Sequence, residues 1–146
     1  MTSNEERAAT LGRALRAGID GDHDALRASL TEDVRAWTPA FATASLEELI
    51  EQLDQRDEAF TDIALDVAPL DVGGDYACVE WTVEMTHTGT LTLGDGTTIE
   101  PTNTRVTMHG VTVAEFEGER ICSLRQYRDE FAVLDQLGVE SGGPTA

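Results

Sequence analysis

The chain has 146 residues, 40% of them hydrophobic, which suits one folded domain with its own core. It carries 28 acidic residues against 10 basic ones, and the net charge of −18 repels phosphate backbones and argues against nucleic-acid binding. No apolar run approaches a membrane span and the polar start MTSNEERAAT does not resemble a secretory signal, so we expect a cytoplasmic protein that does not enter membranes.

All the basic residues are arginine, and two origins of this acidic, lysine-free composition stay open. A GC-rich genome replaces lysine with arginine, whereas a high-salt cytoplasm favours an acidic surface whose self-repulsion is screened. Cys78 and Cys122 lie far apart and form no CxxC pair, so we expect buried free thiols and no zinc site.

The first third of the chain has helical periodicity. Ser3 and Ser45 each begin a capping box, and Asp22 follows Gly21 as a third cap. These signals predict a helix over residues 4–18, a shorter helix after Asp22 and a third helix after Ser45. Between the last two, residues 34–37 look extended.

The rest of the chain alternates with period two, which indicates strands. Residues 63–67 form the first strand, and residues 77–87 show the clearest alternation, with His87 on the apolar face. Residues 98–116 are long for one strand, so we expect a bulge near Asn103 or Gly110. A final strand is predicted from Arg120 to Asp129, followed by a short apolar run.

Helices followed by hairpin-connected strands predict an α+β domain. We expect a curved antiparallel sheet with the N-terminal helices on its concave face and a pocket open at one end. One domain over residues 1–138 and a flexible tail over residues 139–146 complete the prediction.

Several short segments, taken in order, resemble the SnoaL-like polyketide cyclases. These belong to the superfamily with the cone-shaped, cystatin-like fold of nuclear transport factor two. The matching segments are Gly21–Leu26, Thr86–Gly89, Pro101–Asn103, Phe116–Ile121, Tyr127–Asp129 and Gln136–Gly138. Three positions depart from the family pattern: Met85 and Asn103 replace glycines, and Arg128 replaces an aromatic residue. Because asparagine tolerates left-handed backbone, we expect the turn at Asn103 to survive.

The resemblance implies that Asp129 is the general acid/base of an intramolecular aldol closure. The alternative is an exposed aspartate paired with Arg125 or Arg128. For His87 the resemblance favours a hydrogen bond to a substrate oxygen or a proton relay, and the alternative is a core histidine bonded to a backbone carbonyl.

Other residues complete the predicted site. His109 is expected to bind substrate, and with His87 and Asp129 it could form a two-histidine, one-carboxylate metal site if all three converge. We nevertheless predict no metal and no cofactor. Flat apolar ligands would pack on aromatic side chains such as Trp37 and Trp81. The predicted substrate-binding set is Trp37, Trp81, His109, Arg125 and Tyr127. For Trp81, core packing is an equal alternative.

Three functions stay open. The first is a cyclase or isomerase acting on a small apolar carbonyl compound, and the second is a non-catalytic protein that binds a hydrophobic ligand. The third is a structural dimer module, with a homodimer expected through the outer sheet face. A ketosteroid-isomerase route lacks a tyrosine in residues 4–30, and an epoxide-hydrolase route lacks a partner aspartate beside Arg105, so both rank lower.

Overall fold

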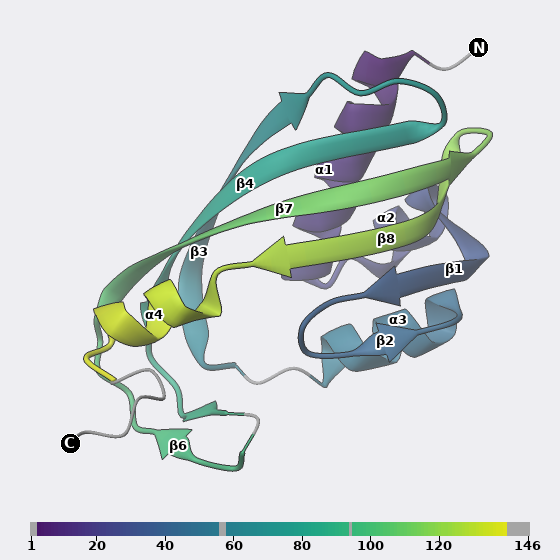
Figure 1. Ribbon diagram of the computed structural model, residues 1–146. Helices are drawn as coiled ribbons and strands as arrows, with labels where there is room; N and C mark the ends of the chain where they lie inside the picture. Colours follow the sequence, from purple (N-terminus) through teal and green to yellow (C-terminus); the bar gives the residue numbers. More distant parts are fainter. Residues whose placement is uncertain (1–2, 56–57, 94, 140–146) are drawn as a thin grey trace. The chain divides into compact units, whose positions relative to one another are not determined.

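The computed structural model describes residues 3–55, 58–93 and 95–139, and Figure 1 traces them in chain order. Within these residues the chain forms four helices and eight strands. They are α1 (Asn4–Asp20), α2 (His23–Ser29), β1 (Leu30–Trp37), β2 (Ala42–Thr43), α3 (Leu46–Asp54), β3 (Phe60–Leu70), β4 (Tyr76–His87), β5 (Leu91–Thr92), β6 (Thr98–Ile99), β7 (Arg105–Glu117), β8 (Arg120–Arg128) and α4 (Glu130–Gln136).

Six strands form one mixed sheet in the order β2-β1-β8-β7-β4-β3, and β5 pairs with β6 separately. β1 runs antiparallel to β2 but parallel to β8, with Ala36 opposite Leu124 and Trp37 opposite Arg125. The α+β class is confirmed, whereas the wholly antiparallel sheet is corrected to a mixed one. A parallel pair needs a long connection, which the chain between β1 and β8 supplies, and the residue alternation does not record strand direction.

The three predicted helix caps are all present. Ser3 Oγ accepts from Glu6 N at 3.1 Å, and Asp22 Oδ1 accepts from Ala25 N at 3.1 Å. Ser45 likewise caps α3 through the backbone N–H three residues on, at 3.2 Å. Each cap satisfies a donor that the first helical turn leaves open, so the local sequence determines where these helices begin.

The C-terminal half differs from its prediction at two places. The long strand over residues 98–116 is divided into β6 and β7, and Asn103 between them adopts φ 56° in the left-handed region, so the expected turn exists. The final strand ends at Arg128, because Asp129 caps a helix, α4, in place of the predicted apolar run.

The contacts divide the chain into two compact units, and each is described by itself. Unit 1 comprises Met1–Arg56, Val67–Trp81 and Gly110–Tyr127, and unit 2 comprises Asp57–Asp66, Thr82–His109 and Arg128–Ala146. The single domain predicted over residues 1–138 stays a prediction. Of the predicted tail, residues 140–146 lie outside the described residues.

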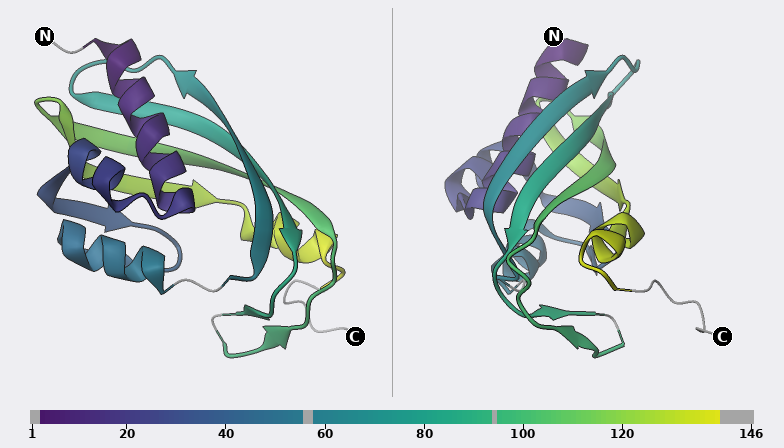
Figure 2. Two further views of the ribbon diagram at one scale, coloured as in Figure 1. Left: turned by 180° about the vertical axis from the view of Figure 1, so that it is seen from behind. Right: turned by 90° about the vertical axis from the view of Figure 1, so that its left-hand side faces the viewer.

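Unit 1 contains the three N-terminal helices, which lie together on one face of its strands (Figure 2). A β-carbon on Gly12 of α1 would lie 3.9 Å from Val67, and one on Gly18 would lie 3.8 Å from Leu53 of α3. Leu11, Leu30, Val34, Val79 and Ile121 are among its fully buried side chains. The helix-on-sheet packing that the sequence predicts is therefore present in this unit.

Unit 2 contains the start of β3, the end of β4, the β5–β6 pair, the start of β7 and helix α4. Along β4 the odd-numbered side chains Val83, Met85 and His87 are buried, whereas Glu84 is exposed. The alternation predicted for this strand is confirmed, and it places His87 at the buried end of the apolar face. No helix in the described part of the chain is long and apolar enough to cross a membrane.

Candidate functional site

His87 ends β4, and one turn of unit 2 surrounds it. The side chain is 0% exposed. Its backbone N–H donates to Thr104 O at 3.0 Å, and its carbonyl accepts from Asn103 N at 2.8 Å. The left-handed conformation of Asn103 lets the turn fold back in this way. The turn therefore holds the backbone of His87 on both sides.

The same turn also holds the imidazole ring of His87. Thr102 donates its backbone N–H to Nδ1 at 3.2 Å, and its Oγ1 lies 3.0 Å from the same nitrogen. Thr104 N donates to Thr102 Oγ1 at 3.3 Å, which orients the hydroxyl. A backbone N–H can only donate, so Nδ1 is the acceptor and the neutral ring carries its proton on Nε2.

The other ring nitrogen of His87, Nε2, differs from Nδ1 in its hydrogen bonding. It is buried and has no hydrogen-bond partner among residues 3–55, 58–93 and 95–139. Phe60 covers part of the ring, with centroids 5.4 Å apart. Leaving a buried donor unpaired costs about 1–3 kcal/mol, so such an atom calls for an explanation. An oxygen of a bound ligand would satisfy it once the side chains that cover the ring moved aside, because the side chain is 0% exposed.

The segment that follows His87 packs very closely against the start of β3. Thr88 N and Gly89 N both donate to Ala59 O at 3.0 Å. A β-carbon on Gly89 would meet the carbonyl oxygen of Glu58, so only glycine fits. This contact fixes the segment Thr86–Gly89, one of the segments that resemble the family pattern, against the residues that lead into the strand carrying Phe60.

Asp129 is exposed and caps α4. Its Oδ1 accepts from Ala132 N at 3.1 Å, and its own N–H donates to His109 O at 3.1 Å. The ion pair with Arg128 that was considered as an alternative does not form among the described residues, because Arg128 Nε binds Glu130 Oε1 at 2.9 Å instead. The carboxylate thus has a structural task, and its predicted role as acid/base stays a prediction.

His109 lies on the other face of the sheet from His87. Its Nδ1 is 3.1 Å from Oγ1 of Thr82, and Thr82 belongs to the even-numbered face of β4, opposite the face of His87. Strand alternation therefore keeps the two imidazoles apart. Among the residues the structure describes, no group of three or more His, Cys, Asp or Glu side chains could hold a metal ion. The predicted substrate contact of His109 would have to come from the outer face.

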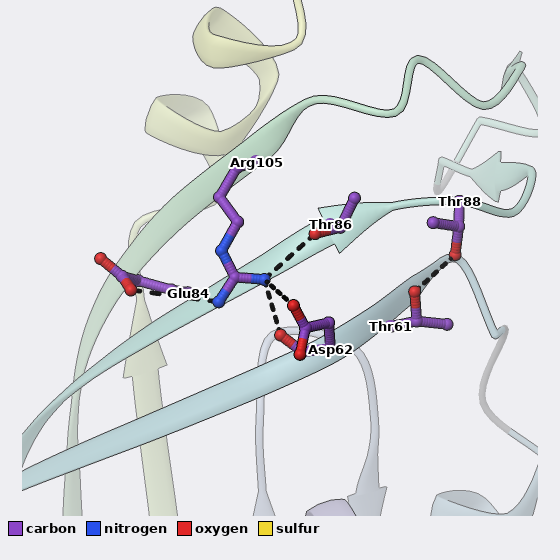
Figure 3. Close-up of polar contacts among 6 residues, drawn as sticks. All are labelled: Thr61, Asp62, Glu84, Thr86, Thr88 and Arg105. Atoms are coloured by element: carbon purple, nitrogen blue, oxygen red, sulfur yellow. Dashed lines mark hydrogen bonds and ion pairs between the residues drawn. The ribbon is translucent and has the colours of Figure 1, made fainter.

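A polar network on that outer face joins three strands of unit 2 (Figure 3). Arg105 Nη1 donates to the carbonyl of Asp62 at 2.6 Å, to its Oδ2 at 3.3 Å and to Thr86 Oγ1 at 3.0 Å. Glu84 Oε2 is 4.0 Å from Arg105 Nη2. Asp62 has φ 53°, and the arginine holds its turned carbonyl. The network ties β7 to β3 and to the residue before His87.

In unit 1, Trp81 belongs to the core. It is 4% exposed, its Nε1 donates to Thr112 Oγ1 at 3.0 Å, and its ring occupies the space above Gly110. With its donor satisfied and its ring packed on backbone, the side chain fits the core-packing alternative. Its predicted contact with substrate stays a prediction.

Trp37 and Tyr127, also in unit 1, form an exposed aromatic pair. Their centroids are 5.3 Å apart, and they are 44% and 48% exposed. Arg125 is the register partner of Trp37 across β1 and β8. These three predicted substrate-binding residues therefore lie together.

Thr102 and Phe60, which contact His87, were not predicted as site residues. Thr102 belongs to the segment Pro101–Asn103 that resembles the family pattern, so that segment could have indicated it.

Comparison with known proteins identifies the family. The sequence profile of the SnoaL-like polyketide cyclases matches residues 9–137. The chain belongs to the SnoaL-like polyketide cyclase family. A search of curated proteins finds no match.

Several solved structures share the fold. A protein from Jannaschia sp. CCS1 described as a SnoaL-like polyketide cyclase is 21% identical, with TM-score 0.76 over 93% of this chain and 94% of that one. IdmH from Streptomyces antibioticus, a proposed polyketide cyclase, is 19% identical, with TM-score 0.75 over 91% and 99%. A limonene-epoxide-hydrolase-like enzyme of M. tuberculosis is 17% identical, with TM-score 0.66 over 91% and 90%. Such different neighbours show a common fold and do not determine the chemistry of this SnoaL-like chain.

Proposed function

We propose that this SnoaL-like protein is an acid/base enzyme that acts on a small, apolar carbonyl compound, in an aldol-type ring closure or a related isomerisation. The observation that carries the proposal is the buried Nε2 of His87, which has no hydrogen-bond partner in the described part of the chain. A neutral donor held rigidly by Thr102 is suited to a carbonyl oxygen, and more so to the enolate oxygen formed from it.

The proposed reaction uses two groups of unit 2. Asp129 removes a proton from the carbon next to the substrate carbonyl, and the electron pair of that C–H bond moves onto the carbonyl oxygen, which accepts the hydrogen bond of His87. The enolate carbon then attacks a second carbonyl, one C–C bond forms, and the new alkoxide takes the proton back from Asp129. A positioned base contributes about 10²–10⁴-fold in rate. One oxyanion donor contributes roughly 10²–10³-fold.

The alternative is a protein that binds a hydrophobic ligand without turnover. It is favoured by the capping contact of Asp129, which gives the carboxylate a structural reason to be present. The proposed ligand is a small apolar or aromatic molecule in either case. The substrate contacts expected of Trp37, Arg125 and Tyr127 in unit 1 stay predictions. A homodimer through the outer sheet face, with residence in the cytoplasm, also remains a proposal.

Deuterium exchange in 2-tetralone would test the proposal, because this flat ketone has acidic C–H bonds beside its carbonyl. We expect the protein in D₂O to accelerate exchange at those carbons, as followed by proton NMR. Asp129→Asn should abolish the acceleration, and His87→Phe should reduce it by about 10²-fold. The matched control is Asp22→Asn, since Asp22 caps α2 with the same 3.1 Å bond.

The other possible results of this experiment distinguish the alternative functions. Binding of 2-tetralone without exchange would favour the ligand-binding alternative. Exchange that survives in Asp129→Asn would remove Asp129 as the base. Neither binding nor exchange would favour the structural module.

A further inference from the structure

Where β8 ends, the backbone of β7 continues with β4 on one edge and no strand of the described chain on the edge that β8 occupied, and a side chain takes that place. Gln136, at the end of α4, accepts from Thr107 N at 2.8 Å through Oε1 and donates to Thr107 O at 2.7 Å through Nε2. In antiparallel sheets a hydrogen-bonded residue pair exchanges these same two bonds. The carboxamide therefore imitates a strand residue.

Two further bonds make this contact a rigid attachment. Gln136 Nε2 also donates to Ala132 O at 2.9 Å, which fixes the side chain against its own helix. Two residues along β7, His109 O accepts from Asp129 N at 3.1 Å. Helix α4 is thus held to β7 at both ends, by backbone at its first turn and by the carboxamide at its last.

We propose that Gln136 is a positioning residue: by replacing a strand partner of Thr107 it fixes α4 on β7 and so sets the direction of the Asp129 carboxylate. A helix of seven residues has little stability of its own, so its orientation depends on such attachments. The carboxylate itself is held by the cap bond to Ala132 N, which moves with the helix. The catalytic value of this positioning rests on the proposed function, but the positioning itself does not.

Amide hydrogen exchange measured by NMR tests the positioning without any substrate. Gln136→Met keeps the length of the side chain and removes both bonds to Thr107. We expect the amides of Asp129 and Ala132 to exchange at least about tenfold faster, while Val79 and Leu11 in unit 1 keep their rates. Gln52→Met, at an exposed position of α3, is the matched control.

A conservative variant provides a second readout. The ionised side chain of Gln136→Glu can accept from Thr107 N but cannot donate to Thr107 O. We expect protection of Asp129 and Ala132 to recover as the carboxyl is protonated below its usual pKa of about 4.3, relative to Gln136→Met at the same pH. Recovery would show that the donated bond, and not side-chain volume, holds the helix.

Three results would overturn the positioning role: unchanged exchange of Asp129 and Ala132 in Gln136→Met, equal acceleration at Val79 and Leu11, or unprotected Asp129 and Ala132 amides in the wild type. Its catalytic consequence is read separately with 2-tetralone. Gln136→Met should lower kcat for deuterium exchange by about tenfold and leave KM unchanged. Altered amide exchange without any wild-type turnover would keep the positioning role and reject the proposed function.

Discussion

The indole of Trp81 lies directly on the backbone of Gly110: a β-carbon at this glycine would collide with the ring. Trp81 cannot move away easily, because it is buried and its N–H is bonded to Thr112. We therefore expect Gly110→Ala to lower the free energy of unfolding by about 1–3 kcal/mol, as overpacking does. Urea unfolding followed by tryptophan fluorescence would measure it. Gly73→Ala is the control, since nothing lies within 4 Å of its β-carbon position; equal effects of the two variants would contradict this explanation.

The cap function of Asp129 can be separated from its chemistry. Asparagine caps a helix nearly as well as aspartate, so Asp129→Asn should change stability by only a few tenths of a kcal/mol. Asp129→Ala should cost about 1 kcal/mol, because Ala132 N loses its acceptor. Thermal denaturation of the two variants, with Asp22→Ala as the reference cap, gives the comparison. Equal melting temperatures for the alanine and asparagine variants would show that the cap contributes nothing.

The turn around His87 depends on the left-handed residue Asn103. Glycine adopts this conformation freely, so Asn103→Gly should leave stability nearly unchanged. Asn103→Val should cost about 1–2 kcal/mol, since a β-branched residue is strongly disfavoured there. Because Asn103 N donates to His87 O, the valine variant should also shift the imidazole NMR signals of His87, with His23 as an internal reference. If Asn103→Val changed neither the stability nor the imidazole NMR signals of His87, the turn would not hold the imidazole ring.

Burial raises the pKa of the thiols of Cys78 and Cys122, and nearby carboxylates act in the same direction. Less thiolate is present at pH 8, so iodoacetamide should modify the folded protein more slowly than a free-cysteine peptide. Because the pKa of each thiol is higher in the folded protein than in the unfolded chain, folding favours the neutral thiols over the thiolates. Their contribution to stability is therefore complete below the unfolded pKa of about 8.5 and is lost as pH rises through the raised folded pKa. Alkylation of Cys122→Ala reports Cys78 alone, and rates equal to those of the peptide would contradict the assignment.

The net charge of −18 predicts a strong response to salt. Raising ionic strength from 0.1 to 1 M shortens the Debye length from about 10 to 3 Å, which screens repulsion between surface carboxylates. We expect the melting temperature to rise steeply with NaCl and less with sucrose, which does not screen charge. A curve that is flat in NaCl would favour the GC-rich explanation of the composition over the high-salt one.

Local chemistry determined the beginnings of helices and the faces of strands. The capping residues Ser3, Asp22 and Ser45 were identified correctly because a cap bond spans only three residues. The burial of His87 followed from alternation along a single strand. The turn at Asn103 followed from the conformational tolerance of asparagine.

Features that join distant segments escaped prediction. The sequence Asp129-Glu130-Phe131-Ala132 has a cap signal, but seven residues are too few for clear helical periodicity, so α4 was missed. The parallel pairing of β1 with β8 leaves no mark on alternation. Thr82 contacts His109 on the face opposite His87. To predict this contact, one needs the register between β4 and β7.

By itself, the sequence determined the α+β class, the family pattern and the candidates Asp129 and His87, because these depend on residue type and short-range spacing. Only the tertiary structure decided which polar atoms are satisfied. Thr102 occupies Nδ1 of His87 and leaves Nε2 without a partner among the described residues, and Gln136 completes the backbone of β7. Hydrogen bonds between residues distant in the chain depend on how the backbone folds, and spacing along the sequence does not contain that information.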